Sequence, residues 1–315
     1  MKNRMELFEN APVWKAYFTI SLPVVFSMVV TLVYNMVDTF FVAGTQNASL
    51  VAGVSQCTPL FMLMLALGDI FGLGGSSLIS RLFGQKDDET ARNVSGFCFY
   101  AAIVCGLIVT VLMFAFQGPV LRVLGATSDT LKYASQYYFW IALGAPLIIL
   151  SLTPSNIIRT EGLAMQSMIA SVAGSILNIV LDPIFIFTLG MGAGGAALAT
   201  VLGYVLSDVL LVCYILRKSR HLTVSIRHAR VARKFVTSVF VIGIPASLTN
   251  LMQSYNIMVL NRHLISYGPK AVAAMGITMK VNMIIMMILV GFAFGAQPLI
   301  GYAYGAGNRS RLRAV

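Results

Sequence analysis

Residues 17–44 read YFTISLPVVFSMVVTLVYNMVDTFFVAG, a predominantly apolar run with a proline, Pro23, near its start and a carboxylate, Asp38, well inside it. About 20 apolar residues suffice to span the hydrocarbon core of a bilayer, so the run predicts a transmembrane helix. A carboxylate inside such a helix costs about 2.5–3.5 kcal/mol on insertion scales. Asp38 therefore either reaches headgroups or water from near the helix end, or serves as an ion or proton site. The second interpretation requires polar partners elsewhere in the chain.

The whole chain has the composition of a polytopic membrane protein. Hydrophobic residues make up 58% of its 315 residues and charged residues only 10%, against roughly a quarter charged in soluble domains. The net charge of +11 would suggest nucleic acid in a soluble chain, but here the basic residues lie between apolar runs, where they set topology. We therefore expect the lipid bilayer as a partner, and not nucleic acid. The four cysteines lie inside apolar runs without metal-ligand spacing, so neither a zinc site nor a disulfide framework is expected.

Short polar segments divide the chain into eight predicted spans. Their approximate bounds are 17–44, 49–80, 93–117, 132–157, 163–189, 193–216, 236–266 and 271–304. Most of the 22 Lys and Arg residues fall on one side if the N-terminus is cytoplasmic, so the positive-inside rule predicts that orientation. The basic segment 217–235 is expected to be a cytoplasmic loop that rests on anionic headgroups, with a regulatory or partner-binding role as the alternative. We assign no chemistry to its histidines, His221 and His228.

An internal repeat lies on either side of this basic segment. With one constant offset, Tyr34-Asn35 aligns with Tyr255-Asn256, and LISRLFG at 78–84 aligns with LIGYAYG at 299–305. The repeating unit holds six spans, an even number, so both copies cross the membrane in the same direction, a plan used by secondary transporters. The second copy stops after two spans, so we expect a fragment of a longer protein, with a naturally short relative as the alternative. The predicted parts are an N-terminal cytoplasmic segment (1–16), a six-helix N-lobe (17–216), a linker (217–235) and a partial C-lobe (236–315).

Further polar side chains are expected at the depth of Asp38. At a rise of 1.5 Å per residue, Asp38, Asp182 and Thr200 all lie about 9–11 Å below the outer ends of their spans. Asn178 precedes Asp182 by about one turn and shares its face, and Pro183 frees a backbone carbonyl at the same level. Such oxygens bind alkali cations, and two neighbouring carboxylates without a cation cannot both stay ionised cheaply. The pattern predicts a shared proton or Na⁺ site; hydrogen bonds that only join helices are the alternative.

Other buried charges give weaker signals. Asp69 lies mid-span beside a glycine-rich stretch, where substrate contact and a structural hydrogen bond are both open. Asp208 is expected to be solvated near the inner face. Lys280, well inside the last span, is expected to pair with a carboxylate or to take part in proton movement. The stretch GLGGSS is not followed by Gly-Lys-Ser/Thr, so no ATP site is expected.

Four motifs carry a resemblance to a known family. PVVFSMVVTLVYNMVDTFFVAG, LISRLFG, NIVLDPIF and GAGGAALATVLG, in this order, resemble the multidrug and toxic compound extrusion (MATE) family, especially its DinF-like branch. The resemblance implies an all-α fold with a six-helix N-lobe and the first two helices of a second six-helix repeat. It also implies export of organic cations and other amphipathic compounds across a bacterial or archaeal inner membrane, coupled to H⁺ or Na⁺, by rocking of two lobes, with no cofactor and no enzymatic reaction.

The resemblance also assigns residues. The cation site, for a proton or Na⁺, would comprise the set selected by depth: Asp38, Asn178, Asp182 and Thr200. Pro23 would be the point at which the first span bends. The substrate cavity is expected to include Tyr34, Asn35, Asp69, Asn156 and Lys280. The chain departs from the family in lacking the last four helices.

Two other functions remain open at this stage. One is a lipid or lipid-linked oligosaccharide flippase of the same superfamily. Such proteins tend to line the central cavity with several cationic side chains, whereas this sequence offers only Lys280. The other is a truncated chain that does not transport. A complete protein is expected to be a monomer, and a naturally short one to form oligomers.

Overall fold

The computed structural model describes residues 6–264 and 269–315, and within 250–281 it describes the helical backbone but only some of the side chains. Every regular element in these ranges is helical. The bounds are α1 Glu6–Glu9, α2 Val13–Gly44, α3 Ala48–Gly84, α4 Asp88–Ala115, α5 Gln117–Val123, α6 Leu131–Arg159, α7 Ala164–Pro183, the π-helical turn η1 Ile184–Thr188, α8 Ala193–Lys218, the 3₁₀ turn η2 Ile226–His228, α9 Arg233–Leu264, α10 Pro269–Gly305 and α11 Arg309–Ala314.

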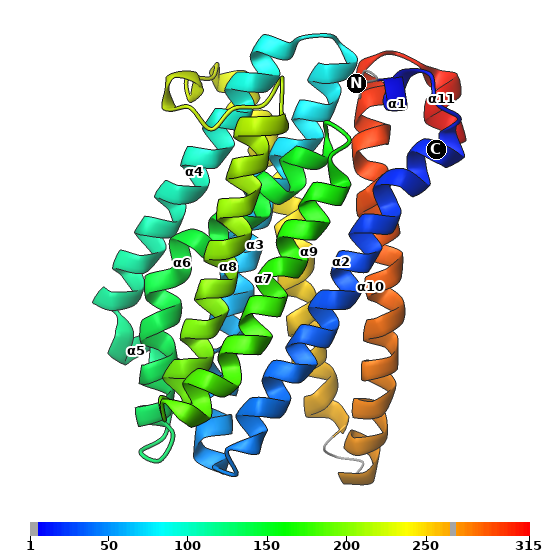
Figure 1. Ribbon diagram of the computed structural model, residues 1–315. Coiled ribbons are helices and arrows are strands. Elements are labelled where there is room, and N and C mark those ends of the chain that lie inside the picture. Colours follow the sequence, from blue (N-terminus) through cyan, green and yellow to red (C-terminus); the bar gives the residue numbers. More distant parts are fainter. Residues whose placement is uncertain (1–5, 265–268) are drawn as a thin grey trace.

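The long helices form an elongated bundle with both chain termini at the upper end in Figure 1. Among the described residues, seven helical stretches are long and apolar enough to cross a membrane. The predicted span 236–266 is helical as far as Leu264, and its last two residues lie outside the described ranges. A helix satisfies its own backbone hydrogen bonds, which is required in a medium without water. The prediction of an all-α polytopic membrane protein is confirmed.

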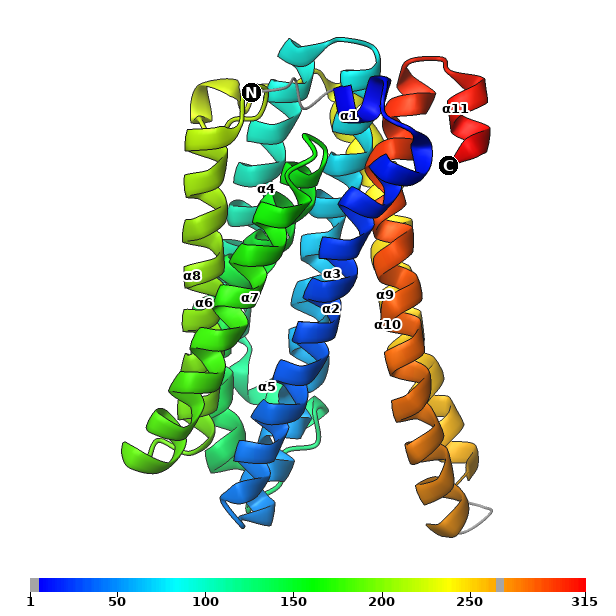
Figure 2. The same cartoon turned by 45° about the vertical axis from the view of Figure 1, so that its right-hand side comes forward.

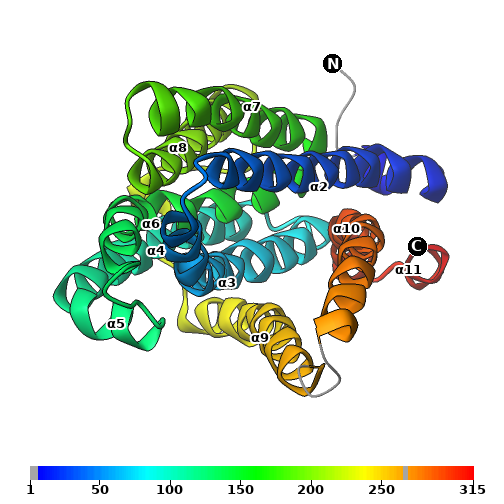
Figure 3. The same ribbon diagram turned by 90° about the horizontal axis from the view of Figure 1, so that it is seen from below.

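Helix α6 lies at the centre of the N-lobe, which we define as α2–α8 (Figure 3). Its second half is almost entirely buried, and α3, α4 and α8 pack around it. Glycines permit these close approaches: a Cβ on Gly72 would lie 2.8 Å from the Leu152 carbonyl oxygen, and Gly144 packs directly against Val201. Small residues at helix contacts are the usual means of association in membranes, where lipid is as apolar as the side chains.

Helices α9 and α10, which we call the second repeat, agree with the internal repeat seen in the sequence. Helix α9 has 32 residues, as α2 has, and α10 has 37, as α3 has. The helix contacts are also equivalent in the two copies. The first helix of each copy packs on the second helix of the other, so α2 contacts α10 and α9 contacts α3. Gly84 and Gly305 occupy equivalent positions, and each contacts the backbone of the opposite helix, at Tyr302 and Arg81. These exchanged contacts indicate an approximate twofold axis between α3 and α10.

The second repeat and α11 pack tightly on the N-lobe and on the N-terminal segment before α2, at the upper end of the molecule. The Tyr302 hydroxyl donates to Glu9 Oε1 at 2.8 Å, and Arg311 Nη2 donates to the Ala11 carbonyl at 2.9 Å. Gln297 Nε2 donates to the Leu73 carbonyl at 3.2 Å. Figure 2 shows that α10 and α2 diverge from this point toward the lower end. The two parts are therefore joined at one end and splayed at the other.

The linker between α8 and α9 is held by hydrogen bonds to the rest of the protein, and its contact with headgroups stays a prediction. Glu161, which is 4% exposed, accepts from Ser219 Oγ at 2.8 Å and from the His221 backbone N–H at 2.9 Å. His221, to which no chemistry was assigned, places Nδ1 3.0 Å from Asp88 Oδ2. The Tyr100 hydroxyl donates to the Val224 carbonyl at 2.9 Å. These contacts dock residues 219–224 onto α4 and onto the turn after α6.

Replacing Glu161 with Ala is expected to release the linker, because two donors would lose a buried acceptor at a cost of about 1–3 kcal/mol each. The measurement is limited trypsin digestion of the purified full chain, since the linker is rich in Lys and Arg. Cleavage within 217–234 should be faster in E161A than in the wild type. The exposed Glu89 provides the control variant E89A. Equal cleavage rates in E161A and E89A would contradict the docking role of Glu161.

Replacing Gly84 with Ala is expected to separate α3 from α10. A Cβ there would meet the Tyr302 carbonyl oxygen, and it would lie 2.6 Å from the Ala306 nitrogen. Overpacking of this kind costs about 1–3 kcal/mol, so G84A should unfold at a lower temperature in detergent. Gly118 has nothing within 4 Å of its Cβ position, so G118A is the matched control. Identical unfolding temperatures for the two variants would argue against the close crossing.

Candidate cation and proton site

The four residues selected by depth come together in the lower half of the N-lobe. Asp182 is fully buried, and Asn178 and Thr200 are 2% and 5% exposed. In the amide orientation that satisfies both of its groups, Asn178 Nδ2 donates to Asp182 Oδ2 at 3.1 Å and its Oδ1 accepts from the Thr200 backbone N–H at 3.0 Å. Helices α7 and α8 are thus joined through one hydrogen-bonded unit.

Asp38 brings a second carboxyl group to this unit from α2. The side chains of Asp38 and Asp182 interact directly. The Asp38 Oδ1 atom is buried and has no hydrogen-bond partner among the described residues. Two carboxylates in contact repel each other when both are ionised. The pair therefore suits one shared proton, or one small cation bound between the two groups.

Three tyrosines surround the carboxyl pair. Tyr34 on α2 interacts with the Thr200 side chain, and it lies near Tyr137 on α6 and Tyr204 on α8. Tyr34 was predicted from the sequence as a cavity residue, whereas Tyr137 and Tyr204 were missed. Both carried a usable signal: Tyr204 lies one turn after Thr200 on the same face, and Tyr137 lies about 9 Å from the outer end of α6 by helical rise.

Local features of α7 and α8 explain why these side chains meet. A Cβ on Gly203 would lie 2.8 Å from the Gly174 carbonyl oxygen, so the two helices cross closely enough for Asn178 to reach Thr200. Pro183 ends the α-helical part of α7, and the π-helical turn η1 follows it. Proline cannot donate to the carbonyl one turn earlier, and π-helical turns often occur at functional sites. The end of α7 is thus irregular beside Asp182.

The residues predicted to line a substrate cavity do not form one group. Asn35 is exposed on α2. Lys280 lies on α10, and its side chain lies outside the described residues. Asp69 and Asn156 are 9% and 8% exposed, and both are associated with the Arg159 side chain instead of the carboxyl pair.

Arg159 lies between the predicted spans 132–157 and 163–189, yet its side chain is buried in the protein. It is the last residue of α6 and only 9% exposed. Its Nε donates to Ser167 Oγ at 3.0 Å, and its Nη2 donates to Ser155 Oγ at 3.2 Å. Long side chains on a helix point back toward its N-terminus, so the guanidinium group enters the lobe although its Cα lies at the helix end.

Asp208 also differs from expectation, because it is not solvated near the inner face. It is 4% exposed, and neither carboxyl oxygen has a hydrogen-bond partner among the described residues. The residue lies on the same face of α8 as Val201 and Leu211, which pack within the lobe. The helical face on which Asp208 lies, and not its position near the end of the span, determines its environment.

The described residues contain no group of three or more His, Cys, Asp or Glu side chains placed to hold a metal ion. The predicted site uses Asn and Thr oxygens beside two carboxyl groups. Hard oxygen donors of this kind suit a proton or an alkali cation better than a transition metal.

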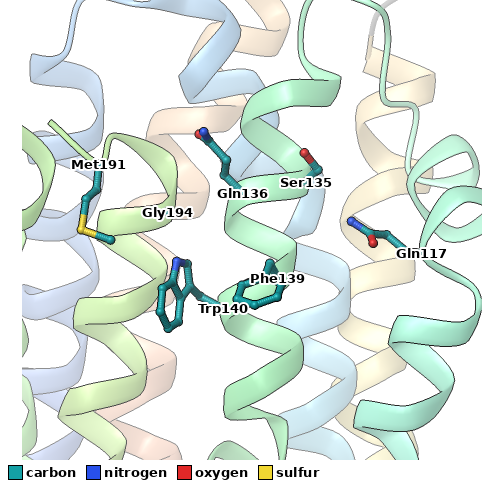
Figure 4. A pocket seen from close by; sticks show the side chains of 7 residues that line it. All are labelled: Gln117, Ser135, Gln136, Phe139, Trp140, Met191 and Gly194. Atoms are coloured by element: carbon teal, nitrogen blue, oxygen red, sulfur yellow. The ribbon is translucent and has the colours of Figure 1, made fainter.

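One surface cavity lies elsewhere in the N-lobe and contains none of the predicted site residues. Its volume is about 420 Å³, and Figure 4 shows its lining from α5, α6, the segment before α8 and the start of α8: Gln117, Ser135, Gln136, Phe139, Trp140, Met191 and Gly194. Phe139 beside it is 46% exposed. This cavity is separate from the carboxyl pair, and we assign no function to it.

Known proteins similar to this chain share both its sequence and its fold. The family model MatE matches residues 23–184 and 245–315. The multidrug export protein MepA of Staphylococcus aureus is 33% identical over 308 residues, which cover 98% of this chain and 68% of MepA.

Two solved structures superpose on the whole chain. One is the outward-facing conformation of a multidrug resistance MATE family transporter of the MOP superfamily, with 32% identity, a TM-score of 0.91 and 69% of that chain covered. The other is a MATE protein in the straight conformation, with 31% identity, a TM-score of 0.92 and 70% covered. The family model and these relatives extend over both the N-lobe and the second repeat. The resemblance inferred from the four motifs is confirmed, and this chain belongs to the MatE family.

Proposed function

We propose that this protein is a cation-coupled antiporter that exports organic cations and other amphipathic compounds across the cytoplasmic membrane of a bacterium or archaeon. The observation that carries the proposal is the buried contact between Asp38 and Asp182, with one Asp38 oxygen lacking a hydrogen-bond partner among the described residues. Ionisable groups inside membrane helices are costly and usually mark ion or proton pathways. The multidrug export function of the relative MepA supports the substrate class.

The coupling ion is a proton or Na⁺ bound at Asp38, Asn178, Asp182 and Thr200. Asp38 lies on α2, whereas the other three lie on α7 and α8. Neutralising the carboxyl pair removes the repulsion between α2 and α7, and an ionised, empty pair restores it. Ion binding therefore changes the preferred position of the lower half of α2, which is the element that can move relative to the rest of the N-lobe.

Pro23 lies where α2 crosses the second repeat. Its neighbours Ser21 and Val25 pack against Gly295 and Gly291 of α10. A proline inside a helix removes one backbone hydrogen bond and permits a bend. A bend at Pro23 leaves the upper part of α2 fixed on α10 and moves the part that carries Asp38. Pro23 is thus the hinge through which ion binding reaches the contact between the two halves.

The chain is oriented with its N-terminus in the cytoplasm, so that the upper end in Figure 1 faces inward. The basic linker and the basic helix α11 lie at that end, as the positive-inside rule requires. In this orientation the inner side is closed by contacts of Tyr302 and Arg311 with the N-terminal segment. The lower parts of α2 and α10 diverge on the outer side (Figure 2).

Replacing Asp38 with Asn is expected to abolish efflux of ethidium driven by a proton or sodium gradient. The amide cannot exchange a proton or supply a second negative charge to the pair, so the site no longer switches between two charge states. The measurement is fluorescence-monitored transport in proteoliposomes of the full chain.

The control for this test is Asp129→Asn, which neutralises an exposed carboxylate outside the site. Asp129→Asn should transport as the wild type does, and both variants should elute as folded protein on size exclusion. Wild-type efflux by Asp38→Asn would remove Asp38 from the coupling role. Transport in response to only one of the two gradients would identify the coupling ion.

The orientation has its own test. Cysteines introduced at Ser128 and Gln85 occupy exposed loops at opposite ends of the N-lobe. A membrane-impermeant thiol reagent should label Ser128→Cys in intact cells, and Gln85→Cys only after permeabilisation. The reverse labelling pattern would place the N-terminus outside. Resident cysteines are buried or partly buried, and the wild type corrects for their background.

A lipid-linked oligosaccharide flippase is the second candidate, and one observation bears on it. Arg159 adds a buried cation to the Lys280 found in the sequence. Its charge, however, lies near Asp69, and its N–H groups already bond to Ser155, Asn156 and Ser167. A guanidinium so engaged is a weak phosphate site, and this favours the antiporter. If an undecaprenyl-linked sugar displaced bound ethidium at lower concentration than other organic cations do, the flippase would be favoured over the antiporter.

A further inference from the structure

Helix α8 carries a line of polar side chains that begins at the carboxyl site. Thr200, Tyr204 and Asp208 follow one another at intervals of four residues, so they share one face of the helix. Each step rises about 6 Å, and the line runs toward the end of the molecule with the two termini. Thr200 bonds to the site through Asn178, and Tyr204 interacts with both Tyr34 and Asp208. The line thus connects the site with Asp208.

Asp208 is a buried carboxyl group whose hydrogen-bonding capacity is unmet. It is 4% exposed, and both of its oxygens are without a partner among the described residues. An ionised carboxylate in an apolar environment without donors is strongly unfavourable. The group must therefore hold a proton whenever it is enclosed as it is here, and it can release that proton only when its surroundings open.

The neighbouring helices offer Asp208 no compensating cation among the described side chains. On α6, Gly144 packs against Val201, which places Ser151 and Thr153 near the level of Asp208. The Ser151 hydroxyl donates to its own helix at 2.9 Å, and Thr153 Oγ1 is buried without a partner in the described part of the chain.

The charged groups of the adjacent helices are engaged elsewhere. Asp69 of α3 and Arg159 of α6 interact with each other, and Asp182 of α7 belongs to the carboxyl pair. Tyr204, one turn earlier on the same helix, interacts electrostatically with Asp208 without a direct hydrogen bond to it.

We propose that Asp208 is a second proton-binding site, which receives a proton from the Asp38–Asp182 pair through the Tyr204 hydroxyl and releases it on the cytoplasmic side. Tyr204 gives its hydroxyl proton to the Asp208 carboxylate and takes one from the pair, so it ends unchanged and one proton has moved. Water completes the path where the side chains do not touch. The inference rests on the proposed antiport, for which it supplies the inner part of the proton route.

The first experiment labels the wild-type protein, so it does not depend on the folding of any variant. A hydrophobic carbodiimide reacts with protonated carboxyl groups in membranes, and peptide mass spectrometry then reports the labelled fraction of each residue across a pH series. Asp208 should be labelled, and its labelling should fall as the pH rises. Absence of label, or a labelled fraction that does not change with pH, would overturn the proposal.

The second experiment separates a moving proton from one that is only structural. In proteoliposomes, Asp208→Asn should lose ethidium transport driven by a pH gradient but retain exchange of internal for external ethidium, which needs no net proton movement. Asp129→Asn should retain both activities. Gradient-driven transport equal to wild type in Asp208→Asn would overturn the proposal, because the amide mimics a carboxyl group that stays protonated.

The same assay distinguishes failure of the proposed antiport from failure of the proton relay through Asp208. If neither a proton gradient nor a sodium gradient drives ethidium transport by the wild type, the proposed antiport fails and the proton relay fails with it. If the wild type transports with a pH gradient and Asp38→Asn does not, the antiport stands. The result for Asp208→Asn then decides the relay alone.

Discussion

Two carboxyl groups can lie in contact inside a membrane only if the helices that carry them are held close together, and the N-lobe is built to do this. Gly174 and Gly203 bring the backbones of α7 and α8 together, which lets Asn178 bond to both Asp182 and Thr200. Helix α2 then packs on α7 and adds Asp38. Without the glycines, the polar side chains would each need separate partners in lipid, where an unmet polar group costs several kcal/mol.

The same close packing connects the site with the rest of the molecule. Helix α2 is shared: one part carries Asp38 against α7, and another part crosses α10 at Gly291 and Gly295. Pro23 lies within the region that crosses α10, between Ser21 and Val25. A change of charge at the carboxyl pair therefore acts on a helix that, together with α3, forms the junction with the second repeat. In the proposed antiport, this shared helix is the route by which ion binding acts on the contact between the two halves.

The buried polar groups of the N-lobe fall into separate environments with different roles. The carboxyl pair carries net negative charge when ionised, and tyrosines surround it. The Arg159 group is balanced by Asp69 and by three hydrogen-bonding side chains, which is the pattern of a structural network. Asp208 has neither a cation nor a donor among the described residues. Charge balance thus separates a network that holds helices together from the groups that we propose exchange protons.

The sequence by itself determined the helices, their order and the depth of each polar residue, because span length and helical rise are local properties. Depth was enough to select Asp38, Asn178, Asp182 and Thr200, and the repeat was visible from aligned residues. Only the tertiary structure decided which side chains face one another at a given level. It assigned Asp69 and Asn156 to Arg159, brought Tyr137 and Tyr204 to the carboxyl pair, and enclosed Asp208. Depth is one coordinate of three, and the direction in which a helix face points depends on contacts between helices far apart in the chain.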